Sequence, residues 1–445
     1  MTEVVSHDPF TGERVFAAPA GDPAAAVIRA YMVQPEWAER PVEERAVTLR
    51  AFAAAVETGS ERLAELLVRE VGKRRVDADG EVAWTALSAR YYADHPPAEE
   101  RAGGARVARR PLGVVAAITP WNVPLVTPAW KWLPALVAGN AVVWKPSERA
   151  TGIALAAAEL LHASGVPEDV LAVVPGGPET ARALAAHELV AGLHFTGSEA
   201  AGRALAALAL PRFARVALEM SGINPAVVLA DADLDLAADC IVACGTALAG
   251  QKCTATRRVL VDAGVADALT ARIAERIERL RVGDPRDPAT DVGPLISAGA
   301  RQTAERQVTR AREAGARVLA QSPRVAGPAL FSPLLLGGLA ADDPLLEREL
   351  FAPVISIQAV DTAQEAWSIA NWVPYGLSAA VYGRDPELLA QAAARIRSGV
   401  LAVNRRGDDV ELEAPFGGRA RSGNGQPEGG TYVYAALTDL QAVYD

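Results

Sequence analysis

The chain has 445 residues, which is too long for one ordinary hydrophobic core, so two or three domains are expected. Half of the residues are hydrophobic and 22% are charged, and this balance excludes a disordered chain. The formal net charge of −10, without a basic stripe interleaved with aromatic residues, excludes a nucleic-acid partner.

Two segments bear on the cellular compartment. The stretch Met1–Gly12 is polar and partly acidic, unlike a secretory signal. The uncharged run from Pro111 to Trp130 is long enough to cross a bilayer, but four prolines interrupt it. So many helix breakers favour a buried strand followed by a loop. We expect a cytoplasmic protein that does not span a membrane.

The chain has three cysteines, Cys240, Cys244 and Cys253. An odd number without a signal peptide indicates a reducing compartment rather than a disulfide framework. The spacing of Cys240 and Cys244 would suit a metal pair on a helix, but none of the five histidines forms a ligand pair with them. We therefore interpret both as small core residues and expect no metal site.

Helical and strand-like patterns alternate along the first half. An Ala-rich helical pattern runs from Pro23 to Ala93, and a Gly- and Arg-rich segment precedes the apolar strand Val114–Ile118. After the Pro-rich loop, the pattern predicts strands at Ala141–Trp144, Val170–Val174 and Gly192–Phe195, and helices at Gly152–Ser164, Glu179–Ala186 and Glu199–Leu210. Such alternation predicts an α/β fold whose parallel sheet carries helices on its faces and a ligand at the carboxyl ends of its strands.

The second half continues in the same style from Ala226 to Gly399. Its strand candidates are Arg258–Val261, Ser356–Val360 and Ala379–Tyr382, and the tail Thr431–Asp445 alternates weakly as a strand would.

Several familiar chemistries lack their motifs. The chain has no G-x-S-x-G, no H-E-x-x-H, no G-x-x-x-x-G-K-[ST] and no G-x-G-x-x-G. The one G-x-G, Gly423–Gly425, lies far from the first strand–helix turn.

Seven other segments follow one another in a characteristic order: Thr119–Pro124, Trp144–Glu148, Phe195–Ser198, Leu218–Gly222, Gly250–Thr254, Glu349–Pro353 and Pro415–Gly418. Their order and content closely resemble the aldehyde dehydrogenase superfamily, from about Pro111 to Val443. The resemblance implies oxidation of a small-molecule aldehyde to a carboxylic acid with NAD(P)+ and a homodimer or homotetramer. It further implies a Rossmann-like cofactor domain (1–103 and 112–221), a second α/β catalytic domain (222–419) and a small β oligomerisation arm (104–111 and 420–445).

The resemblance assigns three catalytic roles. A thiol is a natural nucleophile for an aldehyde, because the thiohemiacetal that it forms can lose hydride and leave an acyl thioester. Cys253, in a turn before a strand, matches this nucleophile, and Lys252 beside it would favour the thiolate. Asn122 matches the donor to the oxyanion, and Glu219, at the end of an apolar run, matches the base that activates water. Each would otherwise be interpreted as a core, turn or surface residue.

The cofactor residues are assigned in the same way. Gly197 and Ser198 end a strand and open a helix, whose N-terminal N–H groups can receive a pyrophosphate. Lys145 and Glu148 match the residues that hold the adenosine ribose. A carboxylate there binds ribose hydroxyls and repels a 2′-phosphate, which favours NAD, whereas Lys145 and Ser147 leave NADP open.

The nicotinamide end of the cofactor is assigned to three further residues. Glu349 resembles the residue that holds the nicotinamide ribose, with Phe351 packed nearby, and Trp121 lies in the segment next to Asn122.

The chain departs from the family pattern in three places. Ser221-Gly222-Ile223 stands where Gly-Gly-Lys is usual, which adds bulk beside Glu219 and removes a cation. Ala352 replaces the usual glycine before Pro353. The loop before Pro415 carries Arg405-Arg406 and Asp408-Asp409. Arg405 or Arg406 is a candidate anchor for a substrate carboxylate, as in a semialdehyde; the alternative is that these charges pair with one another.

Two other functions remain open from the sequence. A coenzyme-A-acylating relative would release the acyl group to a thiol, a route that has no need of Glu219. A retired enzyme kept as a binding or structural protein would be expected to lose Cys253, Asn122 or Glu219, and all three are present.

Overall fold

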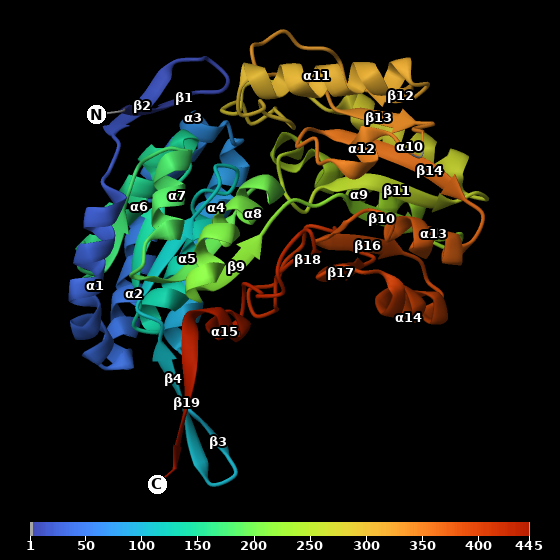
Figure 1. Ribbon diagram of the computed structural model, residues 1–445. Helices are drawn as coiled ribbons and strands as arrows, with labels where there is room; N and C mark the ends of the chain where they lie inside the picture. Colours follow the sequence, from blue (N-terminus) through green and yellow to red (C-terminus); the bar gives the residue numbers. More distant parts are fainter. Residues whose placement is uncertain (1–2, 341, 445) are drawn as a thin grey trace.

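The computed structural model describes residues 3–340 and 342–444. Figure 1 shows two α/β bodies, each built on its own sheet, and a thin β arm that projects from the first body.

The first body is built on a five-stranded parallel sheet of order β7-β6-β5-β8-β9. Its strands are β5 (Val114–Ile118), β6 (Ala141–Lys145), β7 (Leu171–Val173), β8 (Val190–Thr196) and β9 (Arg215–Glu219). The helices that follow β6, β7 and β8 are α6 (Thr151–Ala163), α7 (Pro178–Ala186) and α8 (Glu199–Ala209). The predicted alternation is confirmed, and β5 and β6 are buried throughout, as apolar strands of a parallel sheet should be.

Four helices precede this sheet and confirm the helical pattern from Pro23 to Ala93. They are α1 (Pro23–Glu39), α2 (Val42–Thr58), α3 (Ser60–Val71) and α4 (Arg75–Asp94). The hairpin of β1 (Glu3–His7) and β2 (Arg14–Pro19), which the sequence analysis did not predict, lies before them.

A loop follows β5 as expected, but it ends at residue 125, and helix α5 (Val126–Val137), which was not predicted, forms the rest of the run. Pro128 lies in its first turn, where a helix does not need the missing N–H. The carboxylate of Glu81 accepts hydrogen bonds from the backbone N–H groups of Leu125 and Val126, at 2.8 and 3.1 Å, and so caps the helix. Because this cap comes from α4, the local sequence does not show it. No helix in the described ranges is long and apolar enough to cross a membrane.

The second body is built on a seven-stranded, mainly parallel sheet of order β12-β13-β14-β11-β10-β16-β17. Its strands are β10 (Asn224–Val228), β11 (Thr256–Asp262), β12 (Arg317–Gln321), β13 (Leu334–Gly337), β14 (Val354–Val360), β16 (Ser378–Tyr382) and β17 (Val400–Val403). Its helices are α9 (Leu234–Thr246), α10 (Ala266–Arg279), α11 (Ala298–Glu313), α12 (Pro344–Glu347), α13 (Ala363–Ala370) and α14 (Pro386–Arg395). The three strands predicted for this half are confirmed.

The arm is a three-stranded antiparallel sheet that differs from the expected boundaries. It pairs β4 (Ala105–Pro111) with β3 (Glu100–Ala102) on one side and β19 (Thr438–Tyr444) on the other, so it begins before residue 104. The tail is a strand only from Thr438. Residues 431–437 form the short helices η4 (Thr431–Val433) and α15 (Tyr434–Leu437), because Tyr434 and Leu437 are buried in the core of the first body. Asp445 lies outside the described residues.

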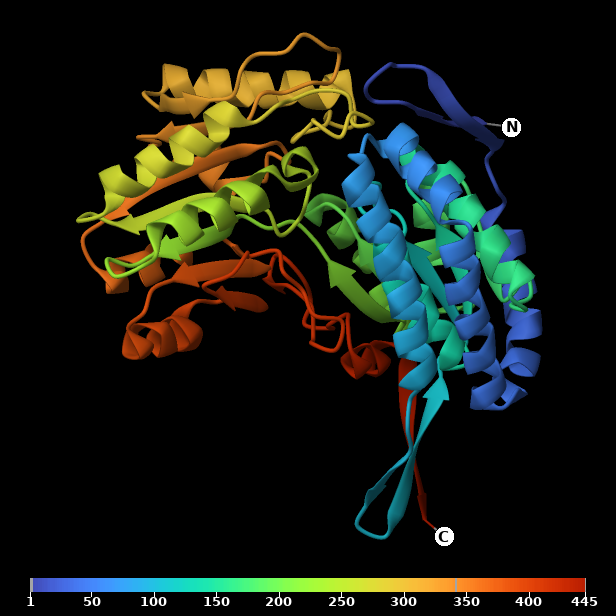
Figure 2. The same ribbon diagram turned by 180° about the vertical axis from the view of Figure 1, so that it is seen from behind.

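The carboxyl end of the first sheet faces the second body, as the view in Figure 2 also shows. Glu219 ends β9, and the loop after β5 carries Asn122. From the second body, the turns before β11 and β14 carry Cys253 and Glu349. Segments that are far apart in the sequence therefore meet at one place.

Candidate active site

Cys253 lies in the turn between η3 (Ala247–Gly250) and β11, as expected. The residue is partly buried. Burial raises the pKa of its thiol to about 12, and the charges of Glu349 and Glu219 add to the rise. Lys252 lowers the pKa, which is the direction we expected, but its effect is smaller than that of burial.

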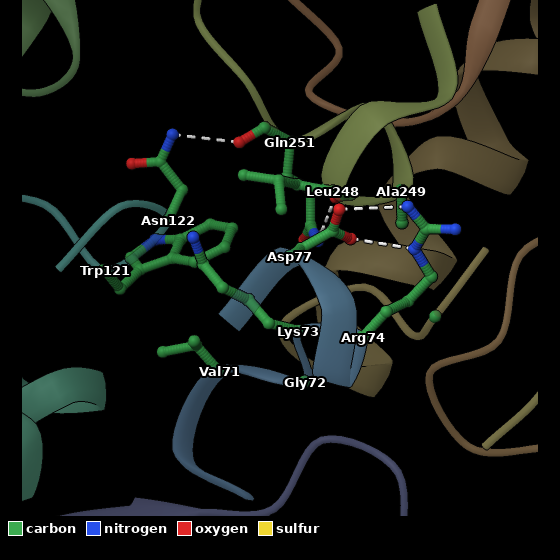
Figure 3. Close-up of a pocket in the computed structure, with 11 residues that line it drawn as sticks. Val71, Gly72, Lys73, Arg74, Asp77, Trp121, Asn122, Leu248, Ala249 and Gln251 are labelled. Carbon is green, nitrogen blue, oxygen red and sulfur yellow. Dashed lines mark hydrogen bonds and ion pairs between the residues drawn. The ribbon is translucent and has the colours of Figure 1, made fainter. Parts of the chain in front are cut away.

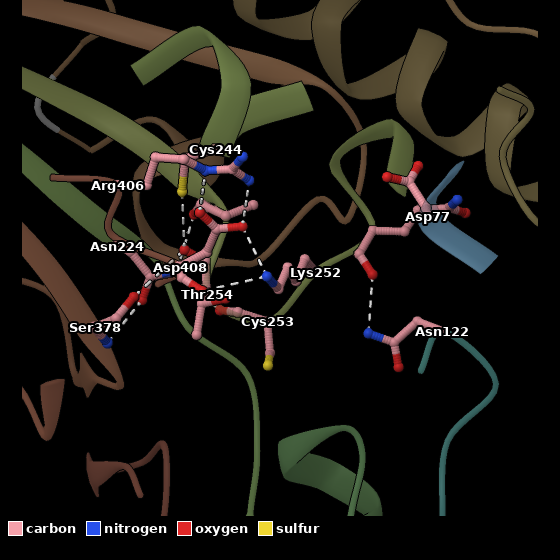
Figure 4. Close-up of polar contacts among 12 residues, drawn as sticks. Asp77, Asn122, Asn224, Cys244, Lys252, Cys253, Thr254, Ser378, Arg406 and Asp408 are labelled. Atoms are coloured by element: carbon pink, nitrogen blue, oxygen red, sulfur yellow. Dashed lines mark hydrogen bonds and ion pairs between the residues drawn. The ribbon is translucent and has the colours of Figure 1, made fainter. Parts of the chain in front are cut away.

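The ammonium of Lys252 is engaged elsewhere. It lies 2.7 Å from the buried carboxylate of Asp408, and Figure 4 shows it turned toward that group while the Cys253 sulfur points away from the pair. Although burial acts in the opposite direction, Lys252 and Arg406 hold the pKa of Asp408 below its usual range.

The backbone turns sharply before the nucleophile. Leu248, Ala249 and Gly250 all have left-handed φ angles, of 51°, 56° and 72°. A Cβ on Gly250 would lie 2.3 Å from the carbonyl carbon of Ala352, so only glycine fits there. Strain of this kind persists only where the surroundings fix the conformation.

Asn122 follows β5 and is buried. Its side-chain amide donates a hydrogen bond of 2.9 Å to the backbone carbonyl oxygen of Gln251 (Figure 4). The amide is thus held beside the loop of Cys253 and retains a second N–H for another acceptor. Gln251 is held in turn, because its side chain accepts from the N–H of Ile296 at 2.7 Å.

A cavity adjoins Asn122 and is lined by residues of both bodies (Figure 3). Its lining includes Trp121, Lys73 and the strained Leu248 and Ala249. In Figure 3 the Arg74 side chain at its edge is paired with Asp77, at 2.8 and 2.9 Å.

Glu219 is the last residue of β9 and is buried. Its carboxylate accepts a hydrogen bond of 3.0 Å from the N–H of Gly418. Burial raises the pKa of Glu219 well above its usual value, the charge of Glu428 adds to the rise, and Lys131 opposes it. Such a carboxyl group is suited to take a proton from water.

Lys131 and Glu428 form a buried ion pair that the sequence analysis did not single out. Lys131 lies on α5, and Glu428 belongs to the segment that pairs with Phe416. The sequence did offer a signal for this pair, because Lys131 directly follows a long uncharged run. A lysine that is buried in such a setting needs an acidic partner.

Ser221 and Ile223, which depart from the family pattern, have different surroundings. Burial raises the pKa of Glu349 to about 7, and Arg257, Ser221 and the backbone of Gly222 oppose the rise. Ile223 is buried and lines a cavity with Tyr375, away from Glu219.

Gly197 and Ser198 lie between β8 and α8, as expected. The Ser198 hydroxyl caps the helix by accepting from the N–H of Ala201 at 3.4 Å. A Cβ on Gly197 would lie 2.6 Å from the ring of Phe195, so the backbone there is packed too closely for a side chain. The other N–H groups at the N-terminus of α8 suit a phosphate group.

The residues expected to hold the adenosine ribose lie at the end of β6. Lys145 and Glu148 form an ion pair of 3.1 Å. Burial lowers the pKa of Lys145, and Glu148 opposes this. The Glu148 side chain is 40% exposed, so its carboxylate stays accessible to a ligand. The hydroxyl oxygen of Ser147 accepts a hydrogen bond of 3.3 Å from the N–H of Arg149, and its O–H remains a donor.

Glu349 and Phe351 lie in the turn before β14. Phe351 has a left-handed φ of 55° and packs edge-on against Trp121, with ring centroids 5.6 Å apart. Among the described residues, the buried oxygens Oε1 of Glu349 and Oγ1 of Thr196 have no hydrogen-bond partner. Both oxygens can bind hydroxyl groups, so these residues fit a dinucleotide.

Arg405 and Arg406 pair with acidic neighbours, which was the second of the two interpretations. Arg405 binds Asp409 at 3.2 Å and Glu411 at 3.0 Å on the surface. Arg406 binds Asp408 through two hydrogen bonds, of 2.9 and 2.8 Å (Figure 4). Asp408 thereby joins Arg406 to Lys252, so two cations share one carboxylate next to Cys253.

Comparison with known sequences gives one consistent result. Residues 2–443 match the model of the aldehyde dehydrogenase family. An N-succinylglutamate 5-semialdehyde dehydrogenase from Sphingopyxis alaskensis is 39% identical over 438 residues, which cover 96% of this chain and 90% of the relative. An alpha-ketoglutaric semialdehyde dehydrogenase from Bacillus subtilis is 32% identical over 442 residues, which cover 96% of this chain and 90% of the relative.

Solved structures agree with this. Lactaldehyde dehydrogenase from Escherichia coli superposes with a TM-score of 0.96 at 32% identity, covering 100% of this chain and 96% of its own. An NADP-dependent enzyme from E. coli superposes with a TM-score of 0.95 at 30% identity, covering 99% of this chain and 94% of its own. An NAD-dependent aldehyde dehydrogenase from Sinorhizobium meliloti superposes with a TM-score of 0.94 at 32% identity, covering 99% of this chain and 91% of its own. The chain belongs to the aldehyde dehydrogenase family.

Proposed function

We propose that this NAD(P)-dependent aldehyde dehydrogenase oxidises a carboxylate-bearing semialdehyde with Cys253 as nucleophile, Asn122 as oxyanion donor and Glu219 as base. The observation that supports these roles best is the meeting of the three residues from separate elements. The Asn122 amide is bonded to the loop of Cys253, and the charge of Glu219 acts on the Cys253 thiol.

The chemistry follows from these groups. The Cys253 thiolate adds to the aldehyde carbon, and the oxygen that becomes negative accepts from the Asn122 amide and the Cys253 backbone N–H. NAD(P)+ supplies the hydride acceptor when it is bound. Glu219 then takes a proton from water while that water adds to the thioester carbon, and the sulfur leaves as thiolate. The sum is aldehyde, NAD(P)+ and water giving carboxylate, NAD(P)H and two protons.

The substrate class is supported by the charge beside the nucleophile. Lys252 and Arg406 share the one carboxylate of Asp408, which leaves an excess positive charge. A distal carboxylate on the substrate would be attracted to it. Arg405 is fully engaged on the surface, so Arg406 is the better anchor of the two. The two relatives named for semialdehydes are consistent with this class.

For the cofactor we propose NAD rather than NADP. The accessible Glu148 carboxylate can bind two ribose hydroxyls but would repel a 2′-phosphate. The Ser147 hydroxyl accepts a hydrogen bond from the turn and keeps its O–H, so Glu148 is the group on which the choice of cofactor rests. Trp121, Gly197, Ser198, Glu349 and Phe351 complete the proposed binding surface.

We further propose a homodimer or homotetramer in the cytoplasm. The arm projects from the first body and exposes Leu440 and Tyr444, and apolar residues on a projecting strand favour contact with another copy. Light scattering after size-exclusion chromatography measures the mass directly.

The proposed function is tested by measuring the absorbance of the reduced cofactor as it forms. Carboxylate-bearing, aliphatic and aromatic aldehydes are each supplied with NAD+ and with NADP+. Cys253→Ala is the blank. Turnover that is fastest on carboxylate-bearing aldehydes with NAD+, and absent in the blank, is the expected result. Addition of coenzyme A separates the acylating alternative, since only that enzyme forms an acyl-CoA. Absence of turnover with every aldehyde would favour a retired enzyme.

A further inference from the structure

Two turns with left-handed backbone meet beside the nucleophile. One is Leu248–Gly250, which leads to Cys253, and the other contains Phe351 and leads to β14. They are in direct contact, because a Cβ on Gly250 would lie within 2.5 Å of three backbone atoms of Ala352 and Pro353. One turn sets the nucleophile and the other carries Glu349, so their relative position matters to both.

A single guanidinium group joins these two turns. Arg257, the second residue of β11, donates from Nη1 to the carbonyl oxygen of Ala352 at 2.7 Å and from Nη2 to that of Gly250 at 2.5 Å. Its Nη2 also lies 3.7 Å from Oε1 of Glu349. The side chain is buried, and its planar fork presents donors in two fixed directions, which an ammonium group does not do.

We propose that Arg257 is a positioning residue that clamps the turn of Glu349 and Phe351 to the turn before Cys253, and thereby sets the affinity for the nicotinamide cofactor. The inference rests on the proposed function, in which Glu349 binds the nicotinamide ribose. Arg257 acts through the two carbonyl groups and the Glu349 carboxylate, not on the substrate.

The charge of Arg257 matters as well as its shape. Burial raises the pKa of Glu349 to about 7, and Arg257 is the largest influence in the opposite direction, followed by Ser221 and Gly222. The other titratable groups that interact with Glu349 are the Cys253 thiol and the Tyr375 hydroxyl. Loss of the guanidinium charge therefore leaves more of Glu349 protonated near pH 7, and a neutral carboxyl group binds ribose hydroxyls less well.

The next residue offers a matched control. Arg258 is also buried on β11, but its guanidinium donates to the carbonyl oxygen of Ile369, at 2.9 Å, and touches neither turn. Its replacement removes a buried arginine from the same strand without changing the charge near Glu349.

The experiment measures binding rather than turnover. The dissociation constant of NAD+ is followed by quenching of tryptophan fluorescence from pH 6 to 9 in the full-length protein and in R257K, R257M and R258M. In R257M we expect the dissociation constant to rise about tenfold and the pH midpoint of binding to move upward from about 7. R257K keeps the positive charge but not the forked guanidinium group. Its pH midpoint of binding should therefore match that of the wild type, while its dissociation constant for NAD+ rises about threefold. R258M lowers the melting temperature only.

Unchanged dissociation constants and midpoints in both Arg257 variants would overturn the inference and leave the proposed function standing. If R257M does not fold, a R257K protein with wild-type affinity overturns it equally. A wild-type protein that binds neither NAD+ nor NADP+ would instead contradict the proposed function.

Discussion

The Asn122 side chain and the Gln251 backbone are joined by a hydrogen bond of 2.9 Å that bridges the two bodies of the protein. Asn122 follows β5 in the first body, and Gln251 lies two residues before Cys253 in the second. The bond therefore fixes the proposed oxyanion donor to the loop of the proposed nucleophile, across 129 residues of the chain.

Replacement of Asn122 by alanine should lower kcat about 100- to 1000-fold, because it removes both the oxyanion donor and the bridge to the nucleophile loop. Asn122→Asp keeps the shape but has no N–H to offer, so it should be similarly impaired. Steady-state rates with the best aldehyde measure this. A tenfold or smaller loss in both variants would contradict the role of Asn122.

The Cys253 thiol should be largely protonated in the cofactor-free enzyme at neutral pH, since its pKa is raised to about 12. The rate of alkylation by iodoacetamide should then rise about tenfold per pH unit from pH 7 to 10, without a plateau. Cys253→Ser reports the background from the buried Cys240 and Cys244. A plateau below pH 8 would show an ionised thiol and refute this.

The pH dependence of thioester hydrolysis should respond to the ion pair beside Glu219. The base must be deprotonated, and its pKa is raised, so the rate falls as the pH drops through that raised value. Glu428 contributes to the rise and Lys131 opposes it. Glu428→Gln should therefore shift the acid limb to lower pH, and Lys131→Met should shift it to higher pH.

Single-turnover rates of acyl-enzyme breakdown between pH 5 and 9 measure these shifts. Removing one partner of a buried pair costs about 3–5 kcal/mol of stability, so each variant is first checked for its melting temperature. The double variant Lys131→Met/Glu428→Gln removes both charges and serves as the control. Identical acid limbs in all folded variants would mean that the pair does not act on Glu219.

Arg406 and Arg405 should differ in their effect on substrate choice. Arg406→Ala removes half of the cationic pair beside Asp408, and KM for a carboxylate-bearing aldehyde should rise about tenfold while that for a neutral aldehyde stays. Arg405→Ala removes only exposed ion pairs, which contribute about 1 kcal/mol or less to stability, and should change neither. Equal activity of both variants on charged and neutral aldehydes would end the anchoring hypothesis.

The sequence predicted those elements whose signal is local. The strands of the parallel sheets are continuous apolar runs between turn residues, so β5, β6 and β11 were recognised almost to their ends. Helix α5 was missed because its N-terminus depends on a carboxylate from α4, which no nearby residue reveals. The strand predicted for the tail was wrong for residues 431–437, because the burial of Tyr434 and Leu437 in the core of the first body overrides a weak alternation.

The site shows the same division. Family resemblance singled out Cys253, Asn122 and Glu219 as candidates, but it did not show that Lys252 is paired with Asp408, or that Arg257 lies between two turns. Those facts depend on pairings across 156 and 95 residues of chain, which motif spacing does not encode.

The placement of residues 431–444 has a consequence for the order in which the protein is made. Tyr434 and Leu437 fill the core of the first body, and β19 supplies an outer strand of the arm, yet both are synthesised after the whole second body. During synthesis, the core of the first body therefore stays incomplete, with part of its apolar surface exposed to solvent, until the second body has left the ribosome. The two bodies cannot mature as independent units, and a chain truncated before residue 431 would lose the integrity of its first half rather than its last.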